Sequence, residues 1–159
     1  MHFNTPFNQQ ISQFEGYTDT YMNLNNAKII QLTKITDPRG NLSIIEQFKD
    51  IPFEIKRTYW IYDVPGGECR GGHAFKQNEE FIVALSGAFD VIVDDGKQKM
   101  TYTLNRSYYG LYVPAGLWRE MNNFSTNSLA LEFGSLHYDS NDYVRDYEKF
   151  LELKHYGKI

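Results

Sequence analysis

Several side chains near the middle of this chain have the chemistry needed to move a proton beside a carbonyl group. His73 and Phe75 are two residues apart, as are Arg57 and Tyr59, and this spacing places side chains on one face of a β-strand. An imidazole that titrates near neutrality removes a proton from carbon, and a phenol or guanidinium stabilises the enolate oxygen that forms. If the two faces meet, His73 and Tyr59 are the predicted catalytic residues.

The arginines around this histidine predict an anionic ligand, because the guanidinium fork fits phosphate. Arg70 lies among glycines, where a ligand can approach the backbone closely. Trp118 is a candidate for stacking on a base or a sugar. The predicted substrate-binding residues are Arg57, Arg70, Arg119, Trp118 and Glu80.

Each of these residues also has a structural interpretation. A lone histidine in a strand is more often a hydrogen-bonded structural residue, and Tyr59 is one of 12 tyrosines. Trp118 could pack in the core or at its rim. The arginines could lie on the surface or form ion pairs, with Glu46, Glu80 and Glu132 as the available partners.

Short strands dominate the elements that must position these side chains. Alternating apolar residues between turn residues predict ten strands, over 27–32, 42–46, 53–64, 70–75, 80–86, 89–93, 99–104, 108–113, 119–123 and 128–134. The segments Asp37–Gly40 and Asp94–Gly96 are predicted turns. Ten short strands at near-regular spacing indicate an all-β sandwich, jelly roll or barrel.

The two ends of the chain differ from this pattern. Residues 1–25 are polar and are predicted to be an extension of a single domain that spans 26–159. The segment Asp139–Asp142 is predicted to cap a short C-terminal helix over about residues 140–153. The apolar face of that helix would consist of Tyr143, Tyr147, Phe150 and Leu151.

Composition excludes several classes of partner. A net charge of −4 provides no basic footprint for nucleic acid, and no apolar run reaches the length of a membrane span. The single cysteine, Cys69, excludes an internal disulfide and is interpreted as a bystander thiol. The N-terminus lacks the basic and apolar regions of a signal peptide, so a cytoplasmic location is expected.

The segment Gly67–Gly87 resembles the first motif of the cupin barrels. In that motif Gly, His, His, Glu and Gly are separated by five, one, four and six residues, and His73 and Glu80 occupy two of these positions. Phe75 stands at the second histidine position. The resemblance implies a cupin jelly roll, also called a double-stranded β-helix barrel.

The second cupin motif corresponds to Pro114–Asn123, with Arg119 at the position of its histidine. Metal-binding cupins use three His and one Glu, but Phe75 has no lone pair and Arg119 repels a cation. The two remaining ligands, His73 and Glu80, are too few for a transition-metal site. We therefore expect neither a metal nor another cofactor.

Further segments resemble one family closely, the cupin-type sugar-nucleotide 3,4-ketoisomerases that act on dTDP-4-keto-6-deoxy-glucose. The resemblance covers roughly residues 28–152. Its most specific parts are the Arg-Gly-Gly-His segment and the closing Asp-Tyr-Val-Arg-Asp-Tyr segment. The matching segments are 37–42, 57–59, 64–67, 70–74, 94–96, 109–114, 118–120, 123–125 and 138–147.

This resemblance implies a metal-free enzyme that moves the keto group of a 6-deoxyhexose from C4 to C3 through an enediol. It implies a dTDP-sugar substrate, a homodimer with exchanged N-terminal strands, and a product used for deoxysugars of surface polysaccharide. His73 matches the first histidine of the family's His-Ala-His motif, a proposed acid/base. Arg57, Tyr59, Arg70 and Arg119 match positions expected near the ligand.

Phe75 is the departure from this family, because a second active-site histidine is usual there. Loss of a general acid or base typically lowers a rate by about 10²–10⁴-fold. One base can serve both carbons if transfer stays on one sugar face, with Tyr59 serving oxygen and Glu79 and Glu80 nearby. Two alternatives therefore stand beside the isomerase: a catalytically weak nucleotide-sugar-binding cupin and a sugar-nucleotide 3,5-epimerase.

Overall fold

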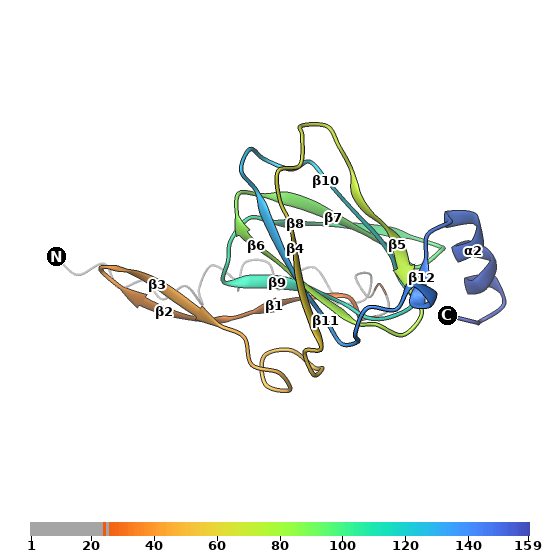
Figure 1. The fold of residues 1–159 in the computed structure, drawn as a ribbon, viewed down its shortest axis with the longest axis horizontal. Coiled ribbons are helices and arrows are strands. Elements are labelled where there is room, and N and C mark those ends of the chain that lie inside the picture. Colours follow the sequence, from red (N-terminus) through yellow and green to blue (C-terminus); the bar gives the residue numbers. More distant parts are fainter. Residues whose placement is uncertain (1–23, 25) are drawn as a thin grey trace, which may run out of the picture.

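Two five-stranded antiparallel sheets face each other and form a β-barrel (Figure 1). The computed structural model describes Leu24 and residues 26–159. In order across the first sheet the strands are β1 (Lys28–Gln31), β9 (Tyr109–Val113), β6 (Glu80–Ser86), β11 (Leu129–Gly134) and β4 (Arg57–Ile61). The second sheet consists of β12 (Tyr143–Val144), β5 (Arg70–Phe75), β10 (Trp118–Asn122), β7 (Phe89–Asp94) and β8 (Lys99–Leu104). The predicted all-β jelly roll with a short C-terminal helix is confirmed.

Most predicted strands form within one or two residues of their expected ends, and 70–75, 80–86 and 99–104 coincide with β5, β6 and β8. The strand predicted over 53–64 is shorter, because only its part over β4 pairs with β11. The predicted extension, 1–25, lies outside the described residues except for Leu24. That side chain is fully buried between the sheets, so the core includes it.

The C-terminal helix begins later than predicted. Ser140–Asp142 form a 3₁₀ turn, η1, and β12 then pairs with the β5 residues Phe75 and Ala74. Helix α2 spans Tyr147–His155, after Asp146 accepts a hydrogen bond from the amide of Lys149 at 2.8 Å. Placing Tyr143 on the helix was therefore wrong, because its backbone satisfies the free edge of a sheet instead.

The barrel interior is divided into an apolar half and a polar half. One half packs aliphatic side chains from both sheets, and it includes Ile82, Val91, Leu111, Met121 and Ala130, all fully buried. Further along the same strands the inward positions carry ionisable groups. This division follows from strand alternation, because Glu80 and Ile82 on β6, or Glu132 and Ala130 on β11, share one face.

Both sheets are also covered on part of their outer faces. Ile51 and Phe53, from the segment before β4, pack on Phe81 and Phe133 of the first sheet. Helix α2 covers the second sheet through Phe150, which packs on Trp118 with ring centroids 5.7 Å apart. The strands beneath are therefore buried on both faces, which holds the inward side chains on a rigid frame.

A two-stranded hairpin extends away from the barrel at the left of Figure 1. It consists of β2 (Thr33–Asp37) and β3 (Gly40–Ile44), and its turn is held by Arg39, whose Nε donates to Asp37 at 2.8 Å. Ile35 and Leu42 pair across the hairpin, and their side chains are 47% and 56% exposed. An apolar pair at this exposure has no partner within the described chain.

Gly71 is required by the packing of a buried arginine. Its φ is +72°, and a Cβ built there would lie 1.8 Å from Arg119 Nη1. The neighbouring Gly72 lacks both constraints, because its φ is not in the left-handed region and a Cβ would meet Trp118 at an ordinary 3.6 Å. Gly71, one of the glycines next to Arg70, therefore leaves room for the guanidinium of Arg119.

We predict that Gly71→Ala lowers the free energy of unfolding by about 2–4 kcal/mol, from the left-handed backbone and the displaced guanidinium together. Urea unfolding followed by tryptophan fluorescence measures this loss. Gly72→Ala is the matched control and should differ little from the wild type. Equal stability of the two variants would contradict the packing described for Arg119.

Candidate active site

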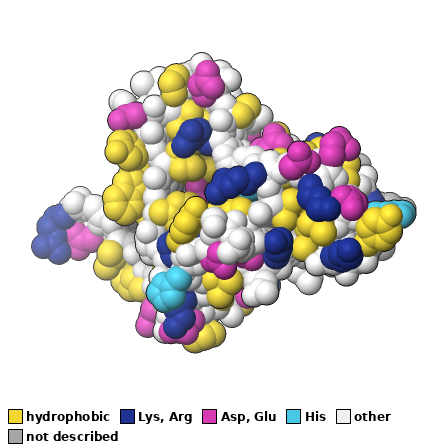
Figure 2. All heavy atoms as spheres, turned by 45° about the vertical axis from the view of Figure 1, so that its right-hand side comes forward, with side chains coloured by type: hydrophobic (Ala, Val, Ile, Leu, Met, Phe, Trp, Pro, Cys, Tyr) yellow, Lys and Arg dark blue, Asp and Glu magenta, His cyan; other side chains and the backbone are white. Residues whose placement is uncertain are grey.

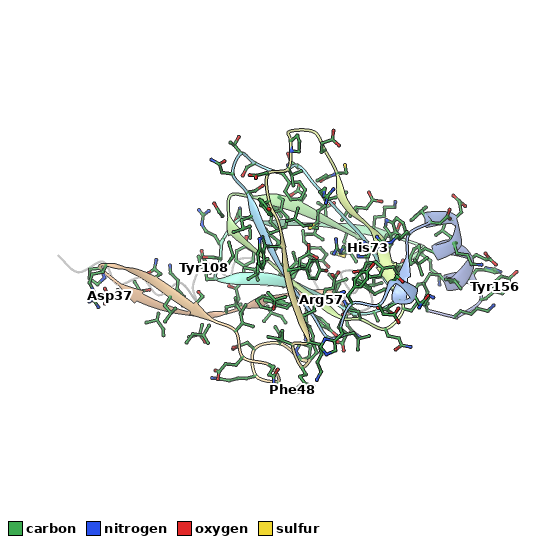
Figure 3. All side chains as sticks on the ribbon, viewed as in Figure 1. Asp37, Phe48, Arg57, His73, Tyr108 and Tyr156 are labelled. Atoms are coloured by element: carbon green, nitrogen blue, oxygen red, sulfur yellow. The ribbon has the colours of Figure 1, made fainter. Side chains whose placement is uncertain are left out.

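Five strands direct ionisable side chains into the polar half of the barrel. Tyr59 comes from β4, His73 from β5, Glu80 from β6, Arg119 from β10 and Glu132 from β11. Register brings them together, because Arg119 pairs with His73 and Glu132 pairs with Tyr59 across adjacent strands. Figure 3 shows His73 at the right-hand end of the barrel and Arg57 below and to the left of it.

Arg119 is the centre of this cluster. Its side chain is 2% exposed, and its Nε and Nη2 donate to Glu80 at 2.9 and 3.0 Å. Nη2 also donates to Glu132 at 2.5 Å, and Nη1 donates to the carbonyl of Gly71 at 3.4 Å. The guanidinium is therefore held by two buried carboxylates, as the ion-pair alternative anticipated.

The two carboxylates have different proton affinities. Burial raises the pKa of Glu132 to about 7, with Arg119 opposing this rise and the charge of Glu80 adding to it. Burial also acts against ionisation of Glu80, but the charge and hydrogen bonds of Arg119 outweigh it and lower the pKa of Glu80. Glu80 is thus the ionised partner, and Glu132 takes up a proton near neutral pH.

Tyr59 is a proton donor in this environment. Its hydroxyl donates to Glu80, and burial together with the charges of Glu80 and Glu132 raises its pKa far above that of a free phenol. The phenol therefore remains protonated at physiological pH and is placed to give its proton to an oxygen that becomes basic.

His73 is an unprotonated base. Its side chain is 7% exposed, and its Nε2 is buried without a hydrogen-bond partner among the described residues. Burial and then the charge of Arg119 lower the pKa of His73 to about 3, although Glu80 acts in the opposite direction. The imidazole is therefore neutral at physiological pH, and its Nε2 is not hydrogen-bonded to another described residue.

Aromatic rings cover His73 on the side of Phe75. The His73 ring lies 4.7 Å from the Phe75 ring and 4.9 Å from the Tyr143 ring, centroid to centroid. Arg57 contacts this cluster, because its Nη1 donates to the Tyr143 hydroxyl at 3.3 Å and its guanidinium lies over Tyr59, 5.0 Å from the ring centroid. A ligand that reaches His73 from this side must displace Tyr143.

Basic side chains surround the outer part of this cluster. Arg145 lies over the Tyr143 ring at 4.1 Å, and Arg57 lies 5.9 Å from the ring of Tyr138, which is 65% exposed. The face in Figure 2 carries Lys and Arg side chains near its centre, next to hydrophobic ones. Guanidiniums beside exposed aromatic rings suit a ligand that combines phosphate with a planar base.

The structure brings most of the predicted site together but not all of it. His73, Tyr59, Arg119 and Glu80 form one cluster, with Arg57 beside it. Arg70 is exposed at the start of β5, outside the buried network.

Trp118 does not fit its predicted role, because it points to the opposite side of β10 from Arg119. Its ring packs against Tyr147 and Phe150 beneath α2, and the side chain is 5% exposed. Of the two interpretations considered for Trp118, packing is therefore the one that the structure supports. The expectation that it stacks on a base or a sugar is corrected.

Two residues of the cluster were not predicted as site residues. Glu132 had been considered only as an ion-pair partner, although its place two residues from Ala130 on a strand puts it on the inward face. Tyr143 was assigned to a helix. Glu79, by contrast, immediately precedes β6 and accepts a hydrogen bond from Tyr112, which packs on the outer side of the first sheet, so Glu79 is outside this site.

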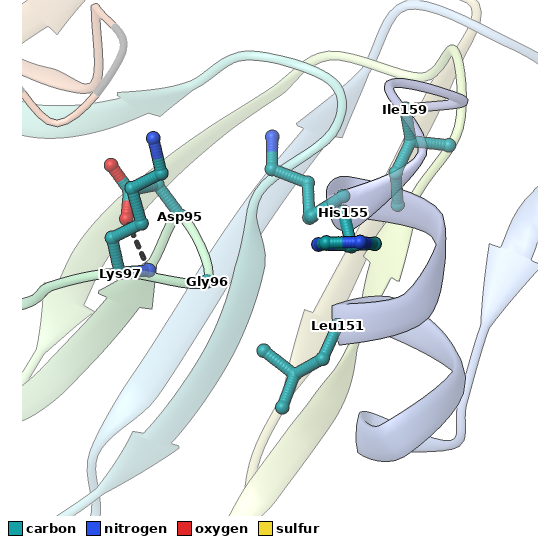
Figure 4. Close-up of a pocket in the computed structure, with 7 residues that line it drawn as sticks. Asp95, Gly96, Lys97, Leu151, His155 and Ile159 are labelled. Atoms are coloured by element: carbon teal, nitrogen blue, oxygen red, sulfur yellow. Dashed lines mark hydrogen bonds between the residues drawn. The ribbon is translucent and has the colours of Figure 1, made fainter.

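A separate cavity of about 590 Å³ lies between the β7–β8 turn and α2 (Figure 4). Asp95 accepts hydrogen bonds there from the amides of Lys97 and Gln98, which shape the turn. This cavity is on the outer side of the second sheet and contains none of the inward residues. Within the described residues no group of three His, Cys, Asp or Glu side chains is arranged to hold a metal ion, and no helix is long and apolar enough to span a membrane.

Sequence comparison connects this geometry to known proteins. The family model described as FdtA, WxcM-like, C-terminal, matches residues 25–155. The TDP-4-oxo-6-deoxy-alpha-D-glucose-3,4-oxoisomerase of Aneurinibacillus thermoaerophilus is 45% identical over 132 residues, which are 83% of this chain and 94% of that protein.

Solved structures show the same likeness. The WlaRB TDP-quinovose 3,4-ketoisomerase of Campylobacter jejuni is 43% identical, with a TM-score of 0.78 over 81% of this chain and 99% of that one. QdtA, a sugar 3,4-ketoisomerase of Thermoanaerobacterium thermosaccharolyticum solved with TDP, is 32% identical, with a TM-score of 0.82 over 86% and 99% of the two chains. A dTDP-4-dehydrorhamnose 3,5-epimerase of Bacillus anthracis is 17% identical with a TM-score of 0.66, which shows a shared fold alone.

The lowered pKa of His73 predicts a specific pH dependence of stability. Between pH 3 and 6.5 the unfolded chain protonates this imidazole and the folded chain does not, so stability attributable to His73 is lost as pH falls through this window. The free energy of unfolding of the wild type minus that of His73→Asn should fall by about 2 kcal/mol between pH 7 and pH 5. Urea unfolding of both proteins at several pH values measures it. A difference that does not change with pH would contradict a neutral, buried His73.

Proposed function

Because this chain belongs to the FdtA family (WxcM-like, C-terminal), we propose that it is a sugar-nucleotide 3,4-ketoisomerase acting on TDP-4-keto-6-deoxyglucose. The product is the TDP-linked 3-keto-6-deoxyhexose. One observation carries the proposal: a neutral His73 with a free Nε2 lies in the same buried cluster as a protonated Tyr59. An imidazole base and a phenol acid are the two groups that enolisation of a ketone needs.

The reaction moves protons and leaves the redox state of the molecule unchanged overall. His73 removes the proton from C3 while Tyr59 donates its proton to the carbonyl oxygen on C4, which gives an enediol. The imidazolium of His73 then returns a proton to C4, and the hydroxyl oxygen on C3 gives its proton back to the Tyr59 phenolate. The carbonyl now lies at C3, and both residues have regained their starting states. No cofactor enters these steps.

Phe75 fits this mechanism because a single base is sufficient when both carbons are served from one face of the sugar. The Phe75 ring packs edge-on against Tyr143 with centroids 4.5 Å apart, so it contributes an apolar wall beside His73. An apolar wall excludes water, which keeps the imidazole neutral and protects an enediol from side reactions. We propose that Arg57, Arg70 and Arg145 bind the diphosphate of the nucleotide.

The catalytic alternative, a 3,5-epimerase, is not favoured, because the epimerases share only the fold with this chain. The remaining alternative is a protein that binds the nucleotide sugar with little turnover. Incubation with TDP-4-keto-6-deoxyglucose in deuterated water separates the three functions. An isomerase forms the 3-keto sugar, an epimerase labels C3 and C5 without moving the carbonyl, and a binding protein retains the ligand unchanged.

We predict that His73→Asn abolishes isomerisation and leaves TDP affinity nearly unchanged, because the imidazole supplies the base and the arginines supply the binding. NMR of the sugar products measures the turnover, and calorimetric titration with TDP measures the affinity. His155→Asn on the exposed side of α2 is the matched control and should retain full activity. Full turnover by His73→Asn would remove His73 from the mechanism.

We also propose a cytoplasmic location, because a reducing compartment keeps the single exposed thiol of Cys69 free. In addition, we propose a homodimer in which the N-terminal strands are exchanged. Two exposed apolar surfaces support the dimer. One is the hairpin pair Ile35 and Leu42. The other is an apolar cavity of about 510 Å³ on the outer side of the first sheet, where Trp60 and Leu85 are 59% and 45% exposed. A second copy that covers such surfaces removes them from water.

Leu42→Glu is predicted to shift the protein from dimer to monomer, because a carboxylate would then be buried in an apolar contact. Analytical ultracentrifugation over a range of concentrations measures the shift. Thr36→Glu, on the opposite face of the hairpin, is the control and should remain dimeric. A monomeric wild type, or a Leu42→Glu variant that dimerises as the wild type does, would contradict the proposed contact.

A further inference from the structure

Three acidic or phenolic oxygens surround one nitrogen of Arg119. Its Nη2 lies 3.0 Å from Glu80 Oε1, 2.5 Å from Glu132 Oε2 and 3.4 Å from the Tyr59 hydroxyl. That nitrogen has only two hydrogens, so it cannot donate to all three oxygens. The contact with Tyr59 is the longest of the three, and the Tyr59 hydroxyl donates its own hydrogen to Glu80.

The charges of this cluster do not cancel. Glu80, Arg119 and Glu132 are at most 2% exposed, and one guanidinium faces two carboxylates. The inward groups next to them are Tyr59 from β4, a neutral phenol, and His73 from β5, a neutral imidazole. Arg57, also on β4, lies beyond Tyr59, with its guanidinium 5.0 Å from the centroid of that ring. A second full negative charge in this interior would be costly, and a bound proton removes it.

One oxygen of the carboxyl pair is left without a partner. Glu132 Oε1 is buried and has no hydrogen-bond partner within the described residues. The other oxygen of Glu132, Oε2, and Oε1 of Glu80 both contact Nη2 of Arg119, at 2.5 and 3.0 Å. Two carboxyl groups that share one guanidinium nitrogen repel each other as anions, which favours one proton held by the pair. The Tyr59 phenol, which donates to Glu80, connects this pair to His73 on the neighbouring strands.

We propose that Glu80 and Glu132 hold one shared proton and, through Tyr59, form the relay that serves the two sugar oxygens. This inference rests on the isomerase proposed above and deepens it. Tyr59 is the catalytic residue of the relay, because it alone of the three is placed to meet the substrate. Glu132 acts through Tyr59 and is a positioning and proton-storing residue.

The relay balances over one turnover. When Tyr59 gives its proton to the oxygen on C4, the O–H bond of the carboxyl pair breaks and its proton passes to the phenolate oxygen. The carboxyl pair then carries two negative charges, which the positive imidazolium of His73 faces. When the hydroxyl on C3 loses its proton to Tyr59, the phenol returns a proton to the carboxyl pair. No proton is gained or lost overall.

Glu132→Gln tests the relay, because the amide keeps the size of the side chain and cannot exchange a proton in this way. We expect kcat to fall by about 10²-fold, as for other general acids, with TDP affinity unchanged. In the wild type kcat should decline as pH rises through about 7, where the shared proton is lost, and this decline should be absent from Glu132→Gln. Wild-type kcat, and the same decline, in Glu132→Gln would overturn the proposal.

Glu79→Gln is the matched control, because Glu79 also accepts a hydrogen bond from a tyrosine, Tyr112, but does so on the outer side of the first sheet. It should keep both the kcat and the pH profile of the wild type. A loss of kcat in Glu79→Gln equal to that in Glu132→Gln would overturn the assignment to the inner pair. Thermal unfolding of both variants shows whether each is folded.

Infrared difference spectroscopy tests the shared proton without any substrate. The wild type should lose a protonated-carboxyl band between pH 6 and pH 9, and Glu132→Gln should lack that band. A wild type without the band overturns the inference even if the protein is an active isomerase. A wild type with the band but no isomerisation would instead overturn the proposed function and leave the shared proton in place.

Discussion

The permanently charged guanidinium of Arg119 lies in the interior of this barrel. The need to neutralise its charge determines which side chains can surround it. Arg119 requires the two carboxylates of Glu80 and Glu132, and it requires Gly71 because a side chain there would occupy the same space. Such an ion pair is not a large source of stability in itself, but removal of one partner leaves a buried charge and costs about 3–5 kcal/mol. The network therefore constrains four strands at once.

The same network decides the protonation states that make chemistry possible. Burial and then the charge of Arg119 lower the pKa of His73, and burial and then the carboxylates raise the pKa of Tyr59, so a neutral imidazole and a neutral phenol belong to one cluster. In water the imidazole would be partly protonated near neutrality. A dry interior and one fixed positive charge thus produce an acid and a base from residues that are unremarkable in solution.

The barrel is a frame of the kind that metal-binding cupins use, with a different positive charge at its centre. Arg119 occupies the position of a metal-binding histidine in the motif, and the motif glutamate, Glu80, pairs with its guanidinium. A guanidinium offers fixed hydrogen-bond donors and no open coordination position. The site is consequently suited to proton transfer between groups held in place, and the apolar half of the barrel keeps those groups from shifting.

The amino-acid sequence by itself was sufficient for most of the strands, the barrel and the family. Alternation and turn residues depend on local physics, and the motif spacing places residues on known strands. It was not sufficient for Trp118, because its burial depends on the helix that covers this side of β10. It was also not sufficient for Tyr143, which pairs with a sheet edge more than 60 residues away in sequence. Nor could it reveal that Glu132 competes with Glu80 for one guanidinium. Such outcomes depend on which charges lie together without water, and only the tertiary structure brings distant strands close enough to decide that.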